Sequence, residues 1–253
     1  MDSIDDTGGL LCDYAAELIS SGATCIRLEK NVRRMALRWG VDVEIDVMPR
    51  HVHLAVKESD GPCRTFMTRE IRGAISYSKV TRLSRLSWQV ADDGLTPADA
   101  RARFEAISRQ PGANRWWILF AASIANAAFC RLFGGDATAM AAVFVATAAG
   151  IYLRQLLLPA GCDVRLAFVA CAFVSSVLAS GCKLFSLGMT PDTAIATSVL
   201  YLVPGIPFLN AFSDLTDGHY VSFFTRLTDA LVLTCCLSAG LCIGMRLMGV
   251  GMF

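Results

Sequence analysis

Residues 201–214, YLVPGIPFLNAFSD, say more about the architecture of this chain than any other segment. Apolar sequence flanks them over the length of a membrane span, yet Pro204, Gly205 and Pro207 interrupt the middle. A simple proline kink is one explanation. The other is a broken span of the kind in which transporters build a substrate site from half-helix ends and free backbone groups.

The two prolines have a predictable effect on the backbone. Because proline has no N–H, the carbonyls of Leu200 and Val203 are expected to lose their helical partners. In hydrocarbon such carbonyls need another helix, water or a ligand. Polar residues follow directly, namely Asn210, Ser213 and Asp214. We therefore expect the break and these side chains to line a pathway, with Asn210 near a cavity at mid-membrane depth.

Charge divides the 253 residues into two parts. Residues 1–115 carry 17 of the 23 Lys and Arg and 16 of the 22 Asp and Glu. The remainder has too little charge for a water-facing surface. The sequence predicts a small soluble α+β domain over residues 1–112 and a transmembrane domain over 113–253.

The front domain shows both helical and strand periodicity. Residues 8–40 are typical of two helices interrupted at Ser20-Ser21-Gly22. Residues 41–47 and 51–56 alternate apolar and polar side chains, which predicts a hairpin, and 63–69 are expected to add a third strand. Helix is predicted again from about Val80 and after Thr96-Pro97, a capped start. We expect this domain to be cytoplasmic, since the acidic N-terminus shows no signal peptide and arginines precede the first span.

The second part is expected to be an α-helical polytopic membrane domain. Five apolar segments are long enough to cross a bilayer, and they cover about 116–133, 137–158, 165–187, 192–212 and 227–248. The fourth is predicted to begin with a Thr190 cap, and Gly240 and Gly244 form a GxxxG motif suited to close helix packing. Residues 213–226 are expected to be a loop or a re-entrant segment.

Ionisable and amide side chains in or beside these spans are hypotheses about function. Asn126 lies within the first predicted span, where it makes an interhelical hydrogen bond or contacts substrate. Asp136 is predicted either to cap the second span or to couple an ion. Arg226 and Asp229 can pair at i, i+3. Asp214, Asp217 and His219 are either a proton relay or a turn.

Several classes of function lack support. No Walker A loop or catalytic triad is present, so the chain is not expected to be an enzyme or to require a cofactor. The ten cysteines form no C-x-x-C pair, and two histidines in one strand are a weak metal signal, so no metal site is expected. A net charge of +1 also argues against nucleic acid as a partner.

The sequence resembles the threonine/serine exporter (ThrE) family. The resemblance rests on LFGGD at 132–136, VPGIPFLNAFSD at 203–214, the later Gly218 and Arg226, and SSGATCIRLE at 20–29. It covers nearly the whole chain. Within the family, the chain is similar to the larger subunit of a two-component succinate exporter of the bacterial inner membrane. That likeness implies a smaller membrane subunit as partner.

The resemblance implies export of a small carboxylate or amino acid, most readily succinate, with threonine or serine as the alternative. In this interpretation Asn126 and Asn210 bind carboxylates, and Arg226 supplies the countercharge. Asp136, Asp214 or Asp229 then couples ion movement. A different class of function, a membrane sensor or scaffold that transports nothing, is the remaining hypothesis.

Overall fold

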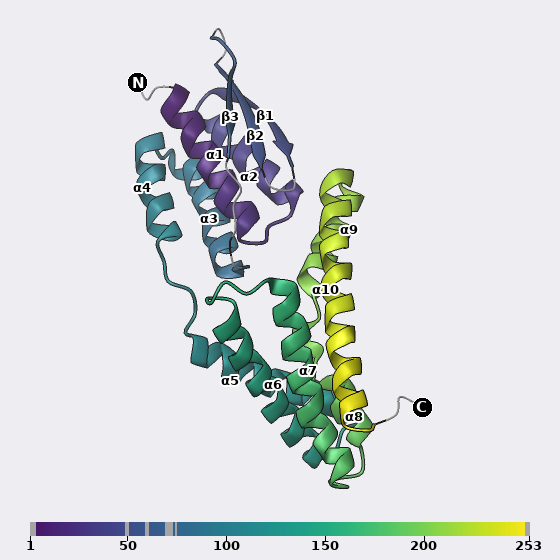
Figure 1. The fold of residues 1–253 in the computed structure, drawn as a ribbon. Coiled ribbons are helices and arrows are strands. Elements are labelled where there is room, and N and C mark those ends of the chain that lie inside the picture. Colours follow the sequence, from purple (N-terminus) through teal and green to yellow (C-terminus); the bar gives the residue numbers. More distant parts are fainter. Residues whose placement is uncertain (1–3, 49–50, 59–60, 69–72, 74, 251–253) are drawn as a thin grey trace. The chain divides into compact units, whose positions relative to one another are not determined.

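A computed structural model describes residues 4–250 of the chain apart from 49–50, 59–60, 69–72 and 74 (Figure 1). Ten α-helices, one 3₁₀ helix and three strands lie in the part that it describes. The residues form two compact units. The first combines Met1–Gly112 with Ile206–Leu227, so it extends beyond the predicted soluble domain, and the second combines Ala113–Gly205 with Thr228–Phe253.

The first unit begins with the predicted pair of helices, α1 (Ile4–Ser20) and α2 (Cys25–Arg38). Gly22, at φ +95°, ends α1 in a conformation that L side chains rarely adopt. Its N–H bonds to the Ile19 carbonyl, and the N–H of Ala23 bonds to the Leu18 carbonyl. The interruption at Ser20-Ser21-Gly22 is therefore a Schellman turn between two helices.

The predicted hairpin and third strand are confirmed. β1 (Val41–Val47), β2 (Val52–Glu58) and β3 (Arg64–Met67) form an antiparallel sheet in the order β1-β2-β3. Val43 pairs with Val56 and Ile45 with Leu54, so their side chains share one face. α1 contacts β2 and β3, while α2 contacts β1, and together these helices cover that face (Figure 1).

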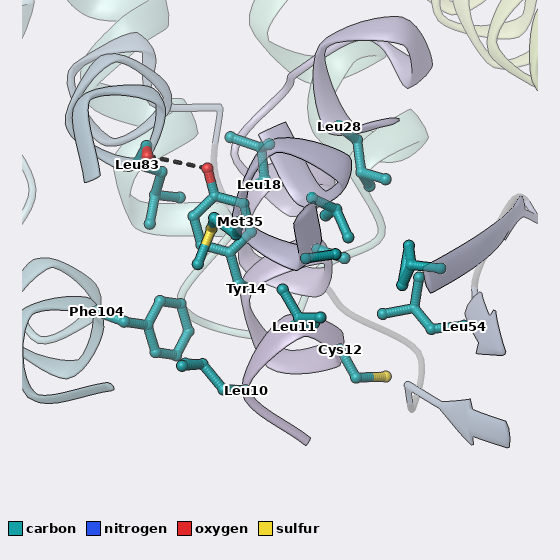
Figure 2. Close-up of a cluster of buried hydrophobic side chains, with 14 of the residues drawn as sticks. Leu10, Leu11, Cys12, Tyr14, Leu18, Leu28, Met35, Leu54, Leu83 and Phe104 are labelled. Atoms are coloured by element: carbon teal, nitrogen blue, oxygen red, sulfur yellow. Dashed lines mark hydrogen bonds between the residues drawn. The ribbon is translucent and has the colours of Figure 1, made fainter. Parts of the chain in front are cut away.

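Helices α3 (Tyr77–Asp93) and α4 (Pro97–Ser108) pack on the side of α1 and α2 away from the sheet. The predicted Thr96 cap is present, since its hydroxyl accepts a hydrogen bond from the Asp99 N–H. The core lies between the layers. Figure 2 shows its centre, where the Tyr14 hydroxyl donates to the Leu83 carbonyl at 2.9 Å and the ring lies beside Phe104.

The second unit is helical. Its elements are α5 (Arg115–Leu132), α6 (Ala137–Leu157), α7 (Val164–Leu184), α8 (Pro191–Thr197), the 3₁₀ helix η1 (Leu200–Leu202) and most of α10 (Tyr220–Leu247). The predicted GxxxG packing is confirmed. A Cβ on Gly240 would overlap the Val169 carbonyl of α7, and one on Gly244 would overlap the Ser176 hydroxyl.

Three helices among the described residues are long and apolar enough to cross a membrane, namely α6, α7 and α10. The helical segments on both sides of the break are Pro191–Leu202 and Gly205–Thr216, and they form a bent pair. If this pair is one span, it is the fourth candidate. Helix α5, the first predicted span, falls outside this set because Arg115, Asn126 and Arg131 lower its mean hydropathy. The predicted count of five is not reached.

Residues 213–226 are mostly helical, which corrects the expectation of a plain loop, while the re-entrant alternative stays a prediction. Helix α9 (Gly205–Thr216) continues to Thr216, and α10 begins at Tyr220. Gly218, at φ +85°, makes the turn between them. The His219 N–H bonds to the Asp214 carbonyl and the Gly218 N–H to the Leu215 carbonyl, which is again a Schellman turn.

The buried hydroxyl of Tyr14 gives a test of the first core. We expect Tyr14→Phe to lower the stability of the first unit by about 1 kcal/mol, since the Leu83 carbonyl loses the hydroxyl donor in a buried site. Thermal unfolding of the purified chain measures this. Tyr77→Phe, which changes an exposed side chain of α3, is the control and should have the wild-type midpoint.

Candidate functional site

Three of the site residues predicted on α9 and α10 gather around the backbone of the α1–α2 turn, residues 22–25. Asn210, Asp214 and Arg226 each contact this turn, and all of them belong to the first unit. We call this group the turn clamp. Along the chain, its members lie about 190 to 200 residues from the backbone groups to which they bond.

Asp214 forms the centre of the turn clamp. Its Oδ1 accepts a hydrogen bond from the N–H of Cys25, the first residue of α2, at 3.0 Å, and the side chain is fully buried. Thr24 occupies the N-cap position of α2 but makes no capping hydrogen bond with its own side chain. Asp214 therefore caps α2 from another helix, where a carboxylate also interacts favourably with the helix dipole.

Arg226 neutralises this buried carboxylate. Its Nη1 lies 3.2 Å from Asp214 Oδ2, and its Nη2 donates to the Ala23 carbonyl at 2.9 Å. The Nη1–Oδ2 contact is an ion pair without hydrogen-bond geometry. The predicted pair between Arg226 and Asp229 is not formed. Arg226 pairs with Asp214 of α9, and not with Asp229 one helical turn away, because the carboxylate of Asp214 is buried and requires a countercharge.

Asn210 completes the turn clamp, and its amide donates to the Gly22 carbonyl at 2.8 Å. The expected position of Asn210 beside a mid-membrane cavity stays a prediction. Ser213, the next candidate, has an exposed hydroxyl that donates to Asp217 Oδ2 at 3.4 Å. The hydroxyl of Ser222 reaches the Val47 carbonyl at 3.4 Å, so α10 also contacts the end of β1.

Two further groups flank the clamp. His219 Nε2 lies 3.4 Å from Glu29 Oε1 of α2, an ion pair when the imidazole is protonated. This links His219 to α2 instead of placing it in a relay with Asp217. Burial raises the pKa of the Cys25 thiol to about 11. The thiol of Cys25 therefore stays protonated at neutral pH, and it is a packed residue of the site without reactive character.

The break after η1 satisfies its own backbone. The Leu200 carbonyl accepts from the Val203 N–H at 3.1 Å, and the Val203 carbonyl accepts from the Gly205 N–H at 2.8 Å. The two carbonyls thus lack their α-helical partners, as expected, but each has another backbone partner. A 3₁₀-type bond and a tight turn replace the α-helical bonds that Pro204 and Pro207 prevent.

Asn126 lies in the second unit, in a buried polar group between helices. Its Nδ2 donates to the Thr147 hydroxyl of α6 at 2.6 Å and to the Thr197 carbonyl of α8 at 3.1 Å. This is the interhelical hydrogen bond that the sequence offered as one of two explanations. Both amide hydrogens have partners in this arrangement, and among the described residues no hydrogen bond to the amide oxygen is formed.

Asp136 caps α6, as one of the two predictions for it stated. Its Oδ1 accepts from the Ala139 N–H at 2.7 Å and its Oδ2 from the Met189 N–H at 2.6 Å. Thr190 stands at the predicted N-cap position of α8, but its hydroxyl accepts from the Asp136 N–H at 2.9 Å and makes no cap bond to its own helix. Asp229 has an exposed side chain. No cluster of potential metal ligands occurs among the described residues.

The comparisons with known proteins show the family. Residues 10–248 match the ThrE family, described as "Putative threonine/serine exporter". The chain belongs to this family. Its members are transporters, so the fold and the family together define a membrane transport protein without enzymatic activity.

Individual relatives define the branch more narrowly. The chain is 28% identical to "Probable succinate transporter subunit YjjP" of Klebsiella aerogenes, over 95% of this chain and 93% of the relative. It is 27% identical to the protein of the same name in Escherichia coli K12, over 92% and 91%. A "Probable threonine/serine exporter" of Mycobacterium tuberculosis is 25% identical over 92% of this chain but 44% of its own length. No solved structure matches the chain.

The cap on α2 gives a local test of the turn clamp. In Asp214→Ala the Cys25 N–H loses its acceptor, so amide hydrogen exchange over the first turn of α2 should become faster, and Arg226 is left without its countercharge. Exchange measured by mass spectrometry on the full chain reports this. The control is Asp217→Ala, three residues away and exposed. Equal exchange in both variants would mean that Asp214 does not cap α2.

The capping role of Asp136 predicts how it responds to pH. The hydrogen bonds from the Ala139 and Met189 N–H groups lower the pKa of Asp136 from its ordinary 3.8. A lowered pKa means that this carboxylate stabilises the fold above about pH 4, and that the contribution is lost as pH falls through the lower folded value. Between about pH 5 and 8 Asp136 stays charged. Asp136→Asn should therefore leave the pH dependence of transport over that range unchanged, measured as flux into vesicles.

Proposed function

We propose that this chain is the larger subunit of a secondary exporter that moves succinate, or a closely similar small carboxylate, across the bacterial inner membrane. The observation that carries the proposal is the similarity to two succinate transporter subunits over more than nine tenths of both chains. A likeness that extends over the front unit, the break and the following helices favours a shared task. The absence of a nucleotide-binding loop from the sequence supports secondary transport.

A partner is part of this proposal. The relatives are named subunits, which supports assembly with a second component. We propose that the component is a smaller, YjjB-like membrane protein. The threonine/serine exporter matches this chain along 44% of its length, which is consistent with a second half that this chain would obtain from a partner. Threonine or serine is the alternative substrate, supported by the family itself.

For topology we propose that the residues up to Gly112 lie in the cytoplasm. Five crossings then require α5 to be the first span, despite its lower mean hydropathy. Interhelical bonds support this, because Asn126 reaches α6 and α8 from the middle of α5 and the stacked Trp116 and Tyr152 join its start to α6. A polar side chain satisfied by neighbouring helices is tolerated within a bilayer.

For the pathway we propose that Pro204, Gly205 and Pro207 form its flexible element, with the free amide oxygen of Asn126 available to substrate. Asn210, Asp214 and Arg226 then connect the break to the front unit through the turn clamp, with Ser213 at its edge. Asp214 Oδ1, Asn210 Nδ2 and Arg226 Nη2 already bond to the backbone of the α1–α2 turn, which supports a mechanical role over direct substrate binding. Asp229 is the ion-coupling candidate whose carboxylate is exposed.

Flux in vesicles tests the proposed function. Vesicles that contain this chain and the partner should release labelled succinate faster than empty vesicles, and faster than they release labelled threonine. The reverse order would favour the amino-acid exporter. Release equal to that of empty vesicles for both compounds would contradict export altogether.

The break distinguishes a transporter from a membrane scaffold. We expect Pro204→Ala combined with Pro207→Ala to abolish succinate release while the chain still copurifies with its partner. Regular helix through 203–207 removes the turn that the two prolines impose. Pro191→Ala is the matched control, because Pro191 stands at the first turn of α8, where proline replaces no hydrogen bond. Unchanged release in the double variant would support a scaffold.

A further inference from the structure

The second unit has one basic residue whose surroundings differ from those of the others. Its Lys and Arg side chains are exposed except for that of Arg154, which is partly buried near the end of α6. Lys183 is paired with Asp192, and Arg131 donates to the Gly135 carbonyl. Among the described residues, no carboxylate lies within ion-pair distance of Arg154.

Arg154 continues a polar face along α6. Thr147, Gly150 and Arg154 follow each other at spacings of three and four residues, so they lie on the same side of the helix. Thr147 binds Asn126 from this face. The guanidinium carbon of Arg154 lies 5.5 Å from the centroid of the buried Phe168 ring of α7, which is a cation–π distance.

The same face of α6 contacts Tyr201, which lies two residues before Val203 at the break. The Tyr201 hydroxyl lies 3.0 Å from the Ser175 hydroxyl, and Ser175 also donates to the Ala146 carbonyl at 3.1 Å. Gly150 makes this arrangement possible, because a Cβ at position 150 would overlap the Tyr201 hydroxyl. Phe168, over whose ring Arg154 lies, packs in one cluster with Cys171 and Tyr201. A polar face thus runs from Asn126 past Tyr201 to an Arg without a carboxylate partner.

We propose that the guanidinium of Arg154 binds a carboxylate group of the transported metabolite. This inference rests on the proposed function and assigns the countercharge to Arg154 instead of Arg226, whose Nη1 and Nη2 are already engaged by Asp214 and Ala23. Arginine binds a carboxylate through two parallel N–H···O bonds, which a point charge does not reproduce. A partly desolvated cation with no protein carboxylate is costly unless an anion joins it for part of the cycle.

The position of Arg154 also suits coupling to the break. Tyr201 belongs to η1, which ends at Leu202, immediately before Val203 and Pro204. Leu153 and Tyr201 pack against the cluster of Phe168 and Cys171, so a shift of Arg154 on binding an anion would reach η1 through Phe168. The proposed anion site and the start of the break at Val203 and Pro204 therefore belong to the same unit.

The test is the concentration dependence of succinate transport by the full chain reconstituted with its partner. Arg154→Gln should raise the KM for succinate by about tenfold or more, the usual effect of removing a charge-assisted hydrogen bond in a partly buried site. The KM of Arg154→Lys should lie between those of Arg154→Gln and the wild type. Lysine keeps the positive charge but cannot make the two parallel hydrogen bonds of the guanidinium. Arg165→Gln, which removes an exposed Arg at the start of α7, is the matched control. Elution from a size-exclusion column checks that each variant is folded.

The outcomes separate the two proposals. If the wild type transports succinate and both glutamine variants have the wild-type KM, Arg154 is not the carboxylate ligand, while the proposed function stands. If the wild type transports threonine instead, the same rise in KM for threonine is expected, because threonine also carries a carboxylate. If the wild type transports neither, the proposed function fails and the anion site with it. Should Arg154→Gln not fold, a wild-type KM in Arg154→Lys overturns the site.

Discussion

The buried carboxylate of Asp214 at the start of α2 is the interaction on which the first unit depends. A helix must satisfy its first N–H groups, and the N-cap residue Thr24 does not do so with its own side chain. Asp214 supplies the acceptor, and its burial then demands a countercharge, which Arg226 provides. The same arginine bonds to the turn before α2, so the cap, the ion pair and the turn are satisfied together or not at all.

The local features of the structure could be read from the sequence. Thr96 and Asp136 cap helices because a side-chain oxygen three residues before an open N–H is a purely local arrangement. The alternation in 41–47 and the Gly22 turn are local in the same sense. The partner of Asp214 was not predictable, since a contact across 189 residues leaves no periodic signal. The i, i+3 spacing predicted Asp229 as the partner of Arg226, because spacing along the sequence identifies only pairs that are close in the chain.

Two kinds of close approach hold the second unit together. Gly240 and Gly244 let α10 reach the backbone of α7, and Gly150 lets Tyr201 reach the interior face of α6. Packing of this type does not rely on water, which is an advantage where the surroundings are as apolar as the helices themselves. The break at Val203 and Pro204 is also satisfied within the protein, because short-range hydrogen bonds satisfy its carbonyls without any ligand. The break therefore needs no ligand to satisfy these two carbonyls.

The distance along the chain between Asp214 and α2 has a consequence for biosynthesis. A growing polypeptide presents its N-terminal residues first, and Cys25 leaves the ribosome long before Asp214 and Arg226 have been made. During that interval the start of α2 lacks its acceptor, although the sheet and the four helices α1–α4 are complete in sequence. The front of the protein thus finishes folding only after the helices that follow it have been synthesised, so its maturation is tied to the completion of the whole chain.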